Sequence, residues 1–110
     1  MTKMVEYVVV LVTCANRKEE EKISQALVEK KLAACVNLVP KVSSRYWWKS
    51  KVETANEVLL IIKTEKSLVN KLITTVKKLH SYTVPEIIAL PILAGNKDYL
   101  NWITDSLKHR

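Results

Sequence analysis

Glycine is nearly absent from this chain of 110 residues, because Gly95 is the only one. Loops that wrap a phosphate group with backbone N–H donors depend on several glycines, so phosphate-cradling loops are excluded. The sequence also lacks the GxSxG and HExxH motifs, and its spacing suggests no pairing of a nucleophile with a base. These absences predict a protein that is not an enzyme.

Long hydrophobic runs are missing as well, and none could span a bilayer. The first apolar run follows Glu6 directly and lacks the small residues of a cleavage site, so we predict no signal peptide. The two cysteines, Cys14 and Cys35, form neither a CxxC pair nor a zinc spacing. We expect a cytoplasmic protein with reduced, buried thiols and no membrane partner.

Hydrophobic residues make up 48% of the chain and charged residues 26%, which predicts one globular domain over residues 1–110. The net charge is +7. The lysine pairs at 30–31 and 77–78 fall at the ends of predicted helices, where they complement the helix dipole. We therefore favour a solvated basic surface over an acidic partner.

Apolar periodicity predicts the element order β-α-β-β-α-β-α. The order is the ferredoxin-like plan of the α+β class, with two helices on one face of an antiparallel sheet and a short C-terminal helix. The predicted strands are 7–13, 32–48 with an interruption or bulge at Pro40, 58–64 after a polar turn at 54–57, and 83–92; the predicted helices are 17–31, 67–80 and one after the turn at Gly95 and Asn96.

The first and the last predicted helices carry further sequence signals. Asn16 is a suitable N-cap for the first helix, and Glu19 stands where a capping box places its acid. In the last helix, the residues expected to point inward are Tyr99, Trp102, Ile103 and Leu107.

The predicted strands are apolar on both faces, although two helices can cover only one face of the sheet. Val8, Val10 and Val12 alternate with further hydrophobic residues on the opposite face. An uncovered face of this kind is rare in monomers, so we expect identical subunits to cover it.

Two adjacent tryptophans, Trp47 and Trp48, stand among basic residues. Stacking on nucleic-acid bases is one interpretation. The other, which we favour, places one indole in the core and the other against a neighbouring subunit. The third strand lacks the aromatic residues with which RNA-recognition sheets of this order read bases, so no nucleic-acid partner is predicted.

Three polar residues have both a structural and a functional interpretation. Lys63 either extends to solvent at the sheet edge or faces Glu86 or an anionic ligand. His80 either favours the C-terminus of the second helix or binds a metal. Cys14 is either a small buried hydrophobic residue or, because it precedes the first helix where a thiolate is stabilised, reactive or a ligand for a soft metal such as copper.

Several motifs in register closely resemble the CutA family of divalent-cation tolerance proteins. The resemblance runs in order from TCAN at 13–16 to YLNWI at 99–103. Between them lie KLAACVNLVP at 31–40, YWW at 46–48 followed by KVE, LLIIKT at 59–64 and HSYTVPEIIALPI at 80–92.

The resemblance implies a stable homotrimer, a link to tolerance of copper and other divalent cations, and an architecture similar to PII signalling proteins. It also implies a metal site made of a first-strand thiol and two histidines. Here His80 keeps one of the two imidazoles and Leu79 stands where the second would be. The only nearby thiol, Cys14, lies at the end of the first strand, two residues after Val12. A cleft between subunits is implied for the remaining candidates, which are Lys63, Glu86, Tyr82, Tyr46 and Trp48.

We therefore predict a cytoplasmic homotrimer that binds copper, another divalent cation or a small ligand at its inter-subunit clefts. No cofactor is expected to be required for folding. The alternative is a PII-like regulatory module that binds a small anion or nucleotide, with metal binding incidental.

Overall fold

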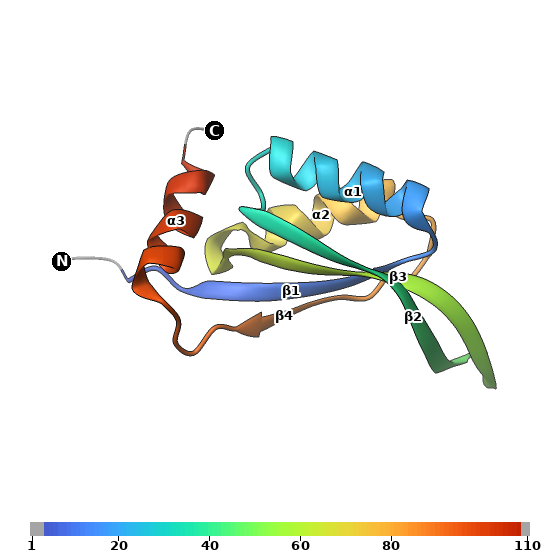
Figure 1. Cartoon of the computed structure of the whole chain (residues 1–110). Helices are drawn as coiled ribbons and strands as arrows, with labels where there is room; N and C mark the ends of the chain where they lie inside the picture. The colour runs from blue at the N-terminus through green and yellow to red at the C-terminus, as the bar shows by residue number, and fades with distance from the viewer. Residues whose placement is uncertain (1–3, 109–110) are drawn as a thin grey trace.

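The computed structural model describes residues 4–108 and confirms the predicted α+β order, with two helices on one face of the sheet and a third at its end (Figure 1). The predicted domain of residues 1–110 includes termini outside this range. The elements are β1 (Tyr7–Cys14), α1 (Arg17–Glu29), β2 (Cys35–Trp48), β3 (Lys51–Glu65), the short 3₁₀ helix η1 (Lys66–Leu68), α2 (Val69–Leu79), β4 (Ile87–Pro91) and α3 (Lys97–Leu107).

The four strands form one antiparallel sheet in the order β2-β3-β1-β4. The two prolines of the strands, Pro40 and Pro91, therefore lie on edge strands, where a missing backbone donor is tolerated. The pairing of β2 with β3 shifts between Val39 and Val42, which confirms the bulge expected around Pro40.

One face of the sheet carries the hydrophobic core beneath α1 and α2. Alternate residues of the two central strands are fully buried there, and helix residues such as Ile23 and Leu72 pack over them. The central-strand residues of this face are Val8, Val10, Val12, Cys14, Val58, Leu60 and Ile62. This row ends at Cys14, so the thiol closes the core at one end of the sheet.

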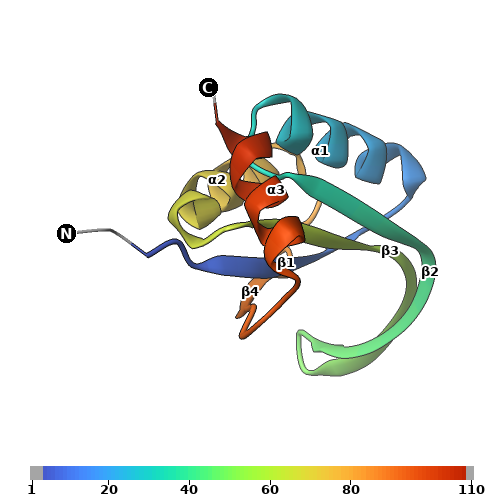
Figure 2. The ribbon, with the colours of Figure 1, turned by 60° about the vertical axis from the view of Figure 1, so that its left-hand side comes forward.

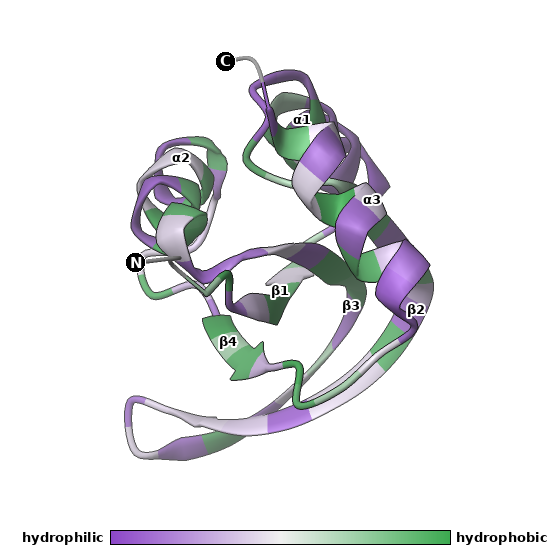
Figure 3. Ribbon diagram, turned by 90° about the vertical axis from the view of Figure 1, so that its left-hand side faces the viewer, coloured by the Kyte–Doolittle hydropathy of each residue, from purple (hydrophilic) through white to green (hydrophobic). Residues whose placement is uncertain are grey.

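The other face of the sheet, called the open face below, is also apolar, as the sequence predicted. Val9 pairs with Leu90 and Leu11 with Ile88, and both β4 residues are half-exposed. Figure 3 shows β4 as a largely hydrophobic strand, with α1 and α2 on the far side of the sheet from the hairpin described next. No helix among residues 4–108 is long and apolar enough to cross a membrane.

The β2–β3 hairpin is longer than predicted. Residues 54–57, expected as a turn, belong to β3, and the chain reverses instead at Lys49 and Ser50 with φ values of 50° and 67°. Such left-handed pairs usually carry asparagine or glycine, so Lys-Ser gave no turn signal. The hairpin projects beyond the sheet and curves away from the helices, which gives a 51 × 26 × 22 Å shape (Figures 1 and 2).

Helix α1 ends earlier than expected. Lys31 leaves it with a left-handed φ of 60°, and its Nζ donates to the carbonyl of Ser106, 3.2 Å away. Lys30 is the C-cap of α1 and Lys31 follows it, so both lysines lie just beyond the last turn of the helix. In α2, by contrast, the lysines at 77–78 do occupy the last turn.

Helix α3 begins as predicted, because the Asn96 side chain accepts a hydrogen bond from the N–H of Asp98 at 3.0 Å. Ile103 and Leu107 are buried, but Tyr99 and Trp102 are exposed, which corrects the expectation that all four point inward. Leu100, Ile103 and Leu107 form the stripe of α3 that packs against the core, and Tyr99 and Trp102 lie off that stripe. Figure 1 shows α3 at the end of the sheet.

Candidate functional site

Three polar residues from separate elements meet where β1 ends. Cys14 is the last residue of β1, Glu19 lies in the first turn of α1, and His80 follows α2. The Cys14 Sγ, one Glu19 carboxylate oxygen and one His80 ring nitrogen lie within 4.8 Å of one another. The structure thus brings together the two predicted metal ligands and adds an acid that the sequence analysis assigned only to capping.

Glu19 is held by the start of its own helix. Asn16 Oδ1 accepts the N–H of Glu19 at 2.9 Å, and Glu19 Oε2 accepts the N–H of Ala15 at 2.9 Å, so the predicted capping pair is confirmed with Ala15 as the donor. Glu19 Oε1 accepts the N–H of Ser81 at 2.7 Å. Burial tends to raise the pKa of Glu19, but the two backbone donors, with His80, lower it below its ordinary value.

The His80 imidazole is fully buried and uses both ring nitrogens. Its Nε2 lies 2.7 Å from the carbonyl oxygen of Thr13, and its Nδ1 accepts the N–H of Tyr82 at 3.0 Å. Because a carbonyl can only accept, Nε2 carries the proton of a neutral ring. The imidazole therefore links β1 to the segment after α2, and the C-terminus of α2 is closed by the backbone N–H of His80 instead.

The Cys14 thiol is fully buried. Burial, together with the negative charges of Glu19, Glu20 and Glu57, raises its pKa to about 12. The expectation that a position before a helix favours the thiolate is therefore wrong here, because burial, together with the surrounding carboxylates, outweighs the helix terminus. At neutral pH the Cys14 sulfur is protonated.

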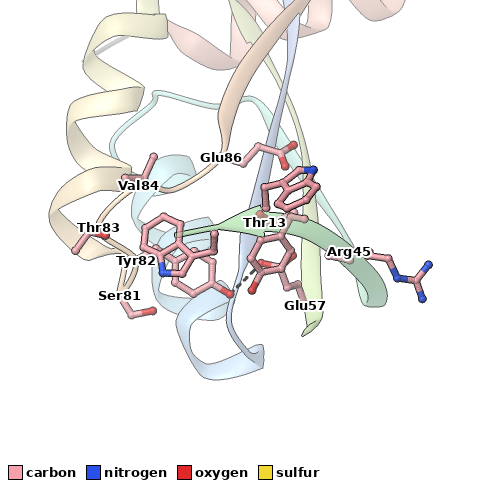
Figure 4. Close-up of a pocket in the computed structure, with 12 residues that line it drawn as sticks. Thr13, Arg45, Glu57, Ser81, Tyr82, Thr83, Val84 and Glu86 are labelled. Carbon is pink, nitrogen blue, oxygen red and sulfur yellow. Dashed lines mark hydrogen bonds between the residues drawn. The ribbon is translucent and has the colours of Figure 1, made fainter. Parts of the chain in front are cut away.

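A cleft of about 830 Å³ opens beside these three residues, between β2 and the segment that follows α2 (Figure 4). The register places Thr13 and Glu57 on the open-face side of the strands, whereas Cys14 faces the helices. The cleft is lined by Thr13, Ser44, Arg45, Tyr46, Trp47, Trp48, Glu57, Ser81, Tyr82, Thr83, Val84 and Glu86.

Glu57 is the cleft residue that sequence reasoning missed, because its segment was predicted to be a turn. Its side chain is buried, with the residue only 8% exposed, and its Oε2 accepts a hydrogen bond from Tyr82 Oη at 2.9 Å (Figure 4). Burial and the neighbouring Glu57 carboxylate raise the pKa of Tyr82 above its ordinary value. Glu57 could be predicted as a cleft residue only if its segment were assigned to a strand. The true turn at Lys49 and Ser50 lacks the usual turn residues, so the sequence did not indicate that strand.

Of the five predicted ligand-binding residues, the structure brings four to this cleft: Tyr46, Trp48, Tyr82 and Glu86. Lys63 lies elsewhere, because it pairs with Val9 and Cys35 further along the open face. No ion pair joins Lys63 to Glu86 within residues 4–108.

The tryptophan pair also differs from expectation. Both indoles line the cleft and neither enters the core, since Trp47 is 75% exposed and Trp48 is 42% exposed. The reason is the length of the hairpin, which carries them past the region that the helices cover. Lys49 Nζ lies 5.9 Å from the ring centroid of Trp48.

The fold and these two sites define a small ferredoxin-like α+β protein with a Cys-Glu-His cluster beside an aromatic cleft. The family model of the CutA1 divalent ion tolerance protein matches residues 8–106. The chain therefore belongs to the CutA1 family.

Individual relatives agree with this assignment. Protein CutA of Mus musculus is 52% identical over 92 residues, covering 84% of this chain and 52% of that protein. The divalent-cation tolerance protein CutA of Thermus thermophilus is 48% identical over 98 residues, covering 89% and 95%. The crystal structure of CutA1 from Oryza sativa has a TM-score of 0.90 at 48% identity and covers 96% of both chains. The chain thus spans about half the length of the mouse relative. The name of the Thermus relative refers to divalent-cation tolerance, and none of the three names refers to a reaction.

Proposed function

We propose that this protein takes part in the response to divalent cations by binding a metal ion at Cys14, Glu19 and His80, without catalysing a reaction. The observation that carries the proposal is the approach of three ligand atoms to within 4.8 Å of one another. Sulfur, imidazole nitrogen and carboxylate oxygen together suit zinc or copper. The family's link to divalent cations supports the same assignment.

The present hydrogen bonds set conditions on that binding. A metal has to displace the Cys14 proton, and the Glu19 and His80 atoms that bind it have to release backbone N–H groups. Only an ion with high affinity for sulfur offsets these losses, which favours copper and zinc over magnesium or calcium. The apparent affinity then rises about tenfold per pH unit, because one proton leaves for each ion bound. Because Glu19 and His80 already have hydrogen-bond partners within the chain, we expect that folding requires no metal.

Calorimetric titration with Zn(II) and Cu(II) tests the metal site. We expect one ion per chain, and Cys14→Ser should abolish binding whereas Cys35→Ser, a matched removal of the other thiol, should leave it intact. Binding that survives Cys14→Ser, or that does not change between pH 6 and pH 8, would contradict the proposal.

We also propose a homotrimer assembled through the open face. Its support is the apolar surface of β1, β3 and β4 on the side without helices, where residues such as Leu90 are half-exposed. Light scattering should give three times the chain mass, and Leu90→Lys should dissociate the assembly. The control is Val28→Lys, which places the same charge on an exposed position of α1. A monomeric mass for the unaltered protein would overturn this part.

A second candidate function is the binding of a small ligand in the cleft, at the border between subunits. The size of the cleft and its aromatic lining support it. The PII-like alternative, in which the ligand is a small anion or nucleotide, has less support. The acidic residues Glu57 and Glu86 line the cleft, whereas the basic residue Lys63 does not. Saturable ATP or phosphate binding that Trp48→Leu weakens would favour the anion. The cytoplasmic location stays a prediction.

A further inference from the structure

The carboxylate of Glu57 is buried but has few hydrogen-bond partners. The residue is more than nine-tenths buried, yet Tyr82 Oη is its only side-chain hydrogen-bond donor within residues 4–108, and it reaches Oε2 alone. No ion pair in that part of the chain includes Glu57. No fully buried side-chain oxygen among the described residues lacks a hydrogen-bond partner, so Oε1, which has none, is in contact with solvent. Because Glu57 lines the cleft, Oε1 is free to accept a hydrogen bond or an ion pair from a ligand that enters it.

The lining of the cleft is negatively charged near Glu57. Glu86 is a second carboxylate on the same cleft, and Arg45 is its only basic residue. Figure 4 shows the Arg45 guanidinium directed away from Glu57 and Tyr82. The chain as a whole carries a net charge of +7, so this acidic cleft runs against the overall charge. The local field thus favours a cation where the surface elsewhere favours anions.

Aromatic rings make up much of the remaining wall, from Tyr46, Trp47, Trp48 and Tyr82. The π faces of such rings attract organic cations, and rings around a carboxylate are how proteins recognise ammonium groups. A hard metal ion needs six or more oxygen ligands and retains water, which aromatic walls do not supply. The combination of one open carboxylate oxygen with aromatic faces therefore fits an alkylated ammonium ion better than a metal ion.

We infer that the cleft binds an organic ammonium cation, with its positive nitrogen against Glu57 and its alkyl groups against the tyrosine and tryptophan rings. This inference rests on the second proposal above, that the cleft takes a small ligand. It is independent of the metal site, which lies on the helix side of the sheet.

Tryptophan fluorescence of the full chain, with chelator present, tests the inference. The probe is choline, and the matched neutral probe is 3,3-dimethylbutan-1-ol, which replaces the charged nitrogen by carbon. We expect saturable quenching or shift of the emission with choline, and binding at least tenfold weaker for the alcohol. Glu57→Gln keeps an acceptor for Tyr82 Oη and should also weaken choline binding at least tenfold. Glu21→Gln removes an equal charge from an exposed site on α1 and should not change it.

Three results would overturn the inference. Equal binding of the alcohol and choline would show an apolar cleft without charge selection, and the proposed small-ligand site would then stand. Tighter binding of ATP than of choline would show that the cleft binds an anion instead of an ammonium cation. Absence of binding by every probe would remove both the inference and the small-ligand proposal. Zn(II) binding that depends on Cys14 would still support the metal site.

Discussion

Two carboxylates near the end of β1 are buried to almost the same extent but are satisfied in opposite ways. Glu19 is 9% exposed and accepts two backbone N–H groups, from Ala15 and Ser81. Glu57 is 8% exposed and accepts one hydroxyl, from Tyr82. Glu19 therefore belongs to an enclosed cluster on the helix side of the sheet, and Glu57 belongs to an accessible cleft on the open-face side.

The difference shows how burial alone misleads about function. The enclosed cluster is saturated by the chain's own donors, so it contributes stability and admits a metal only at the expense of those bonds. In the cleft, no donor from residues 4–108 reaches Glu57 Oε1, so a ligand meets no competing contact from that part of the chain. The segment 80–82 couples the two, because Ser81 donates to Glu19 while Tyr82 donates to Glu57.

The largest effect expected concerns the thiol of the enclosed cluster. With its pKa raised to about 12, Cys14 has a thiolate fraction near neutral pH about a thousandfold below that of an ordinary cysteine. In the Cys35→Ser variant, which leaves Cys14 as the only thiol, iodoacetamide should react at least a thousandfold more slowly in the native protein than in urea. Comparable rates, followed by mass spectrometry, would mean that the cluster is not enclosed.

Next in size is the removal of the enclosed carboxylate. Glu19→Ala leaves the N–H groups of Ala15 and Ser81 without their acceptor, so we expect a loss of about 2–4 kcal/mol in the free energy of unfolding. Glu21→Ala, an exposed acid on the same helix, should cost less than about 0.5 kcal/mol. Urea denaturation at matched protein concentration measures both, and similar losses in the two variants would contradict the assignment.

The acid dependence of stability should be smaller but specific. Because the folded-state pKa of Glu19 is lowered, its contribution is fully present above the unfolded-state pKa of about 4.3 and is lost as the pH falls through the folded value. The difference in unfolding free energy between the unaltered protein and Glu19→Ala should therefore shrink below about pH 4.3. A difference that grows on acidification would show the opposite sign of shift.

The smallest effect is expected at the cleft. Tyr82→Phe removes the hydroxyl that donates to Glu57, but water can reach the carboxylate from the cleft, so the loss should be only about 0.5–1.5 kcal/mol. Tyr46→Phe removes a hydroxyl from the same cleft that donates to no side chain of the described residues and serves as the control. If Tyr82→Phe destabilised the protein as strongly as Glu19→Ala, the contrast between the two regions would fail.

Much of this fold follows from local sequence signals. The continuous apolar run at 7–13 predicts a strand, Asn16 with Glu19 predicts a capped helix, and Pro40 predicts an irregular edge strand; each is confirmed. The errors lie where such signals were weak. Lys49 and Ser50 form a left-handed turn without glycine or asparagine. The sequence therefore predicts a shorter hairpin than the structure has, and it places Glu57 in a turn instead of in β3.

The sequence by itself determined the order of elements, the apolar character of both sheet faces and the family, because these depend on residue type and periodicity along the chain. Only the tertiary structure decided which polar groups meet. Cys14, Glu19 and His80 come from three elements, and Glu57 reaches Tyr82 across 25 positions of the chain. Burial among carboxylates, which reverses the expected ionisation of Cys14, is likewise a property of the packed arrangement and of no single segment.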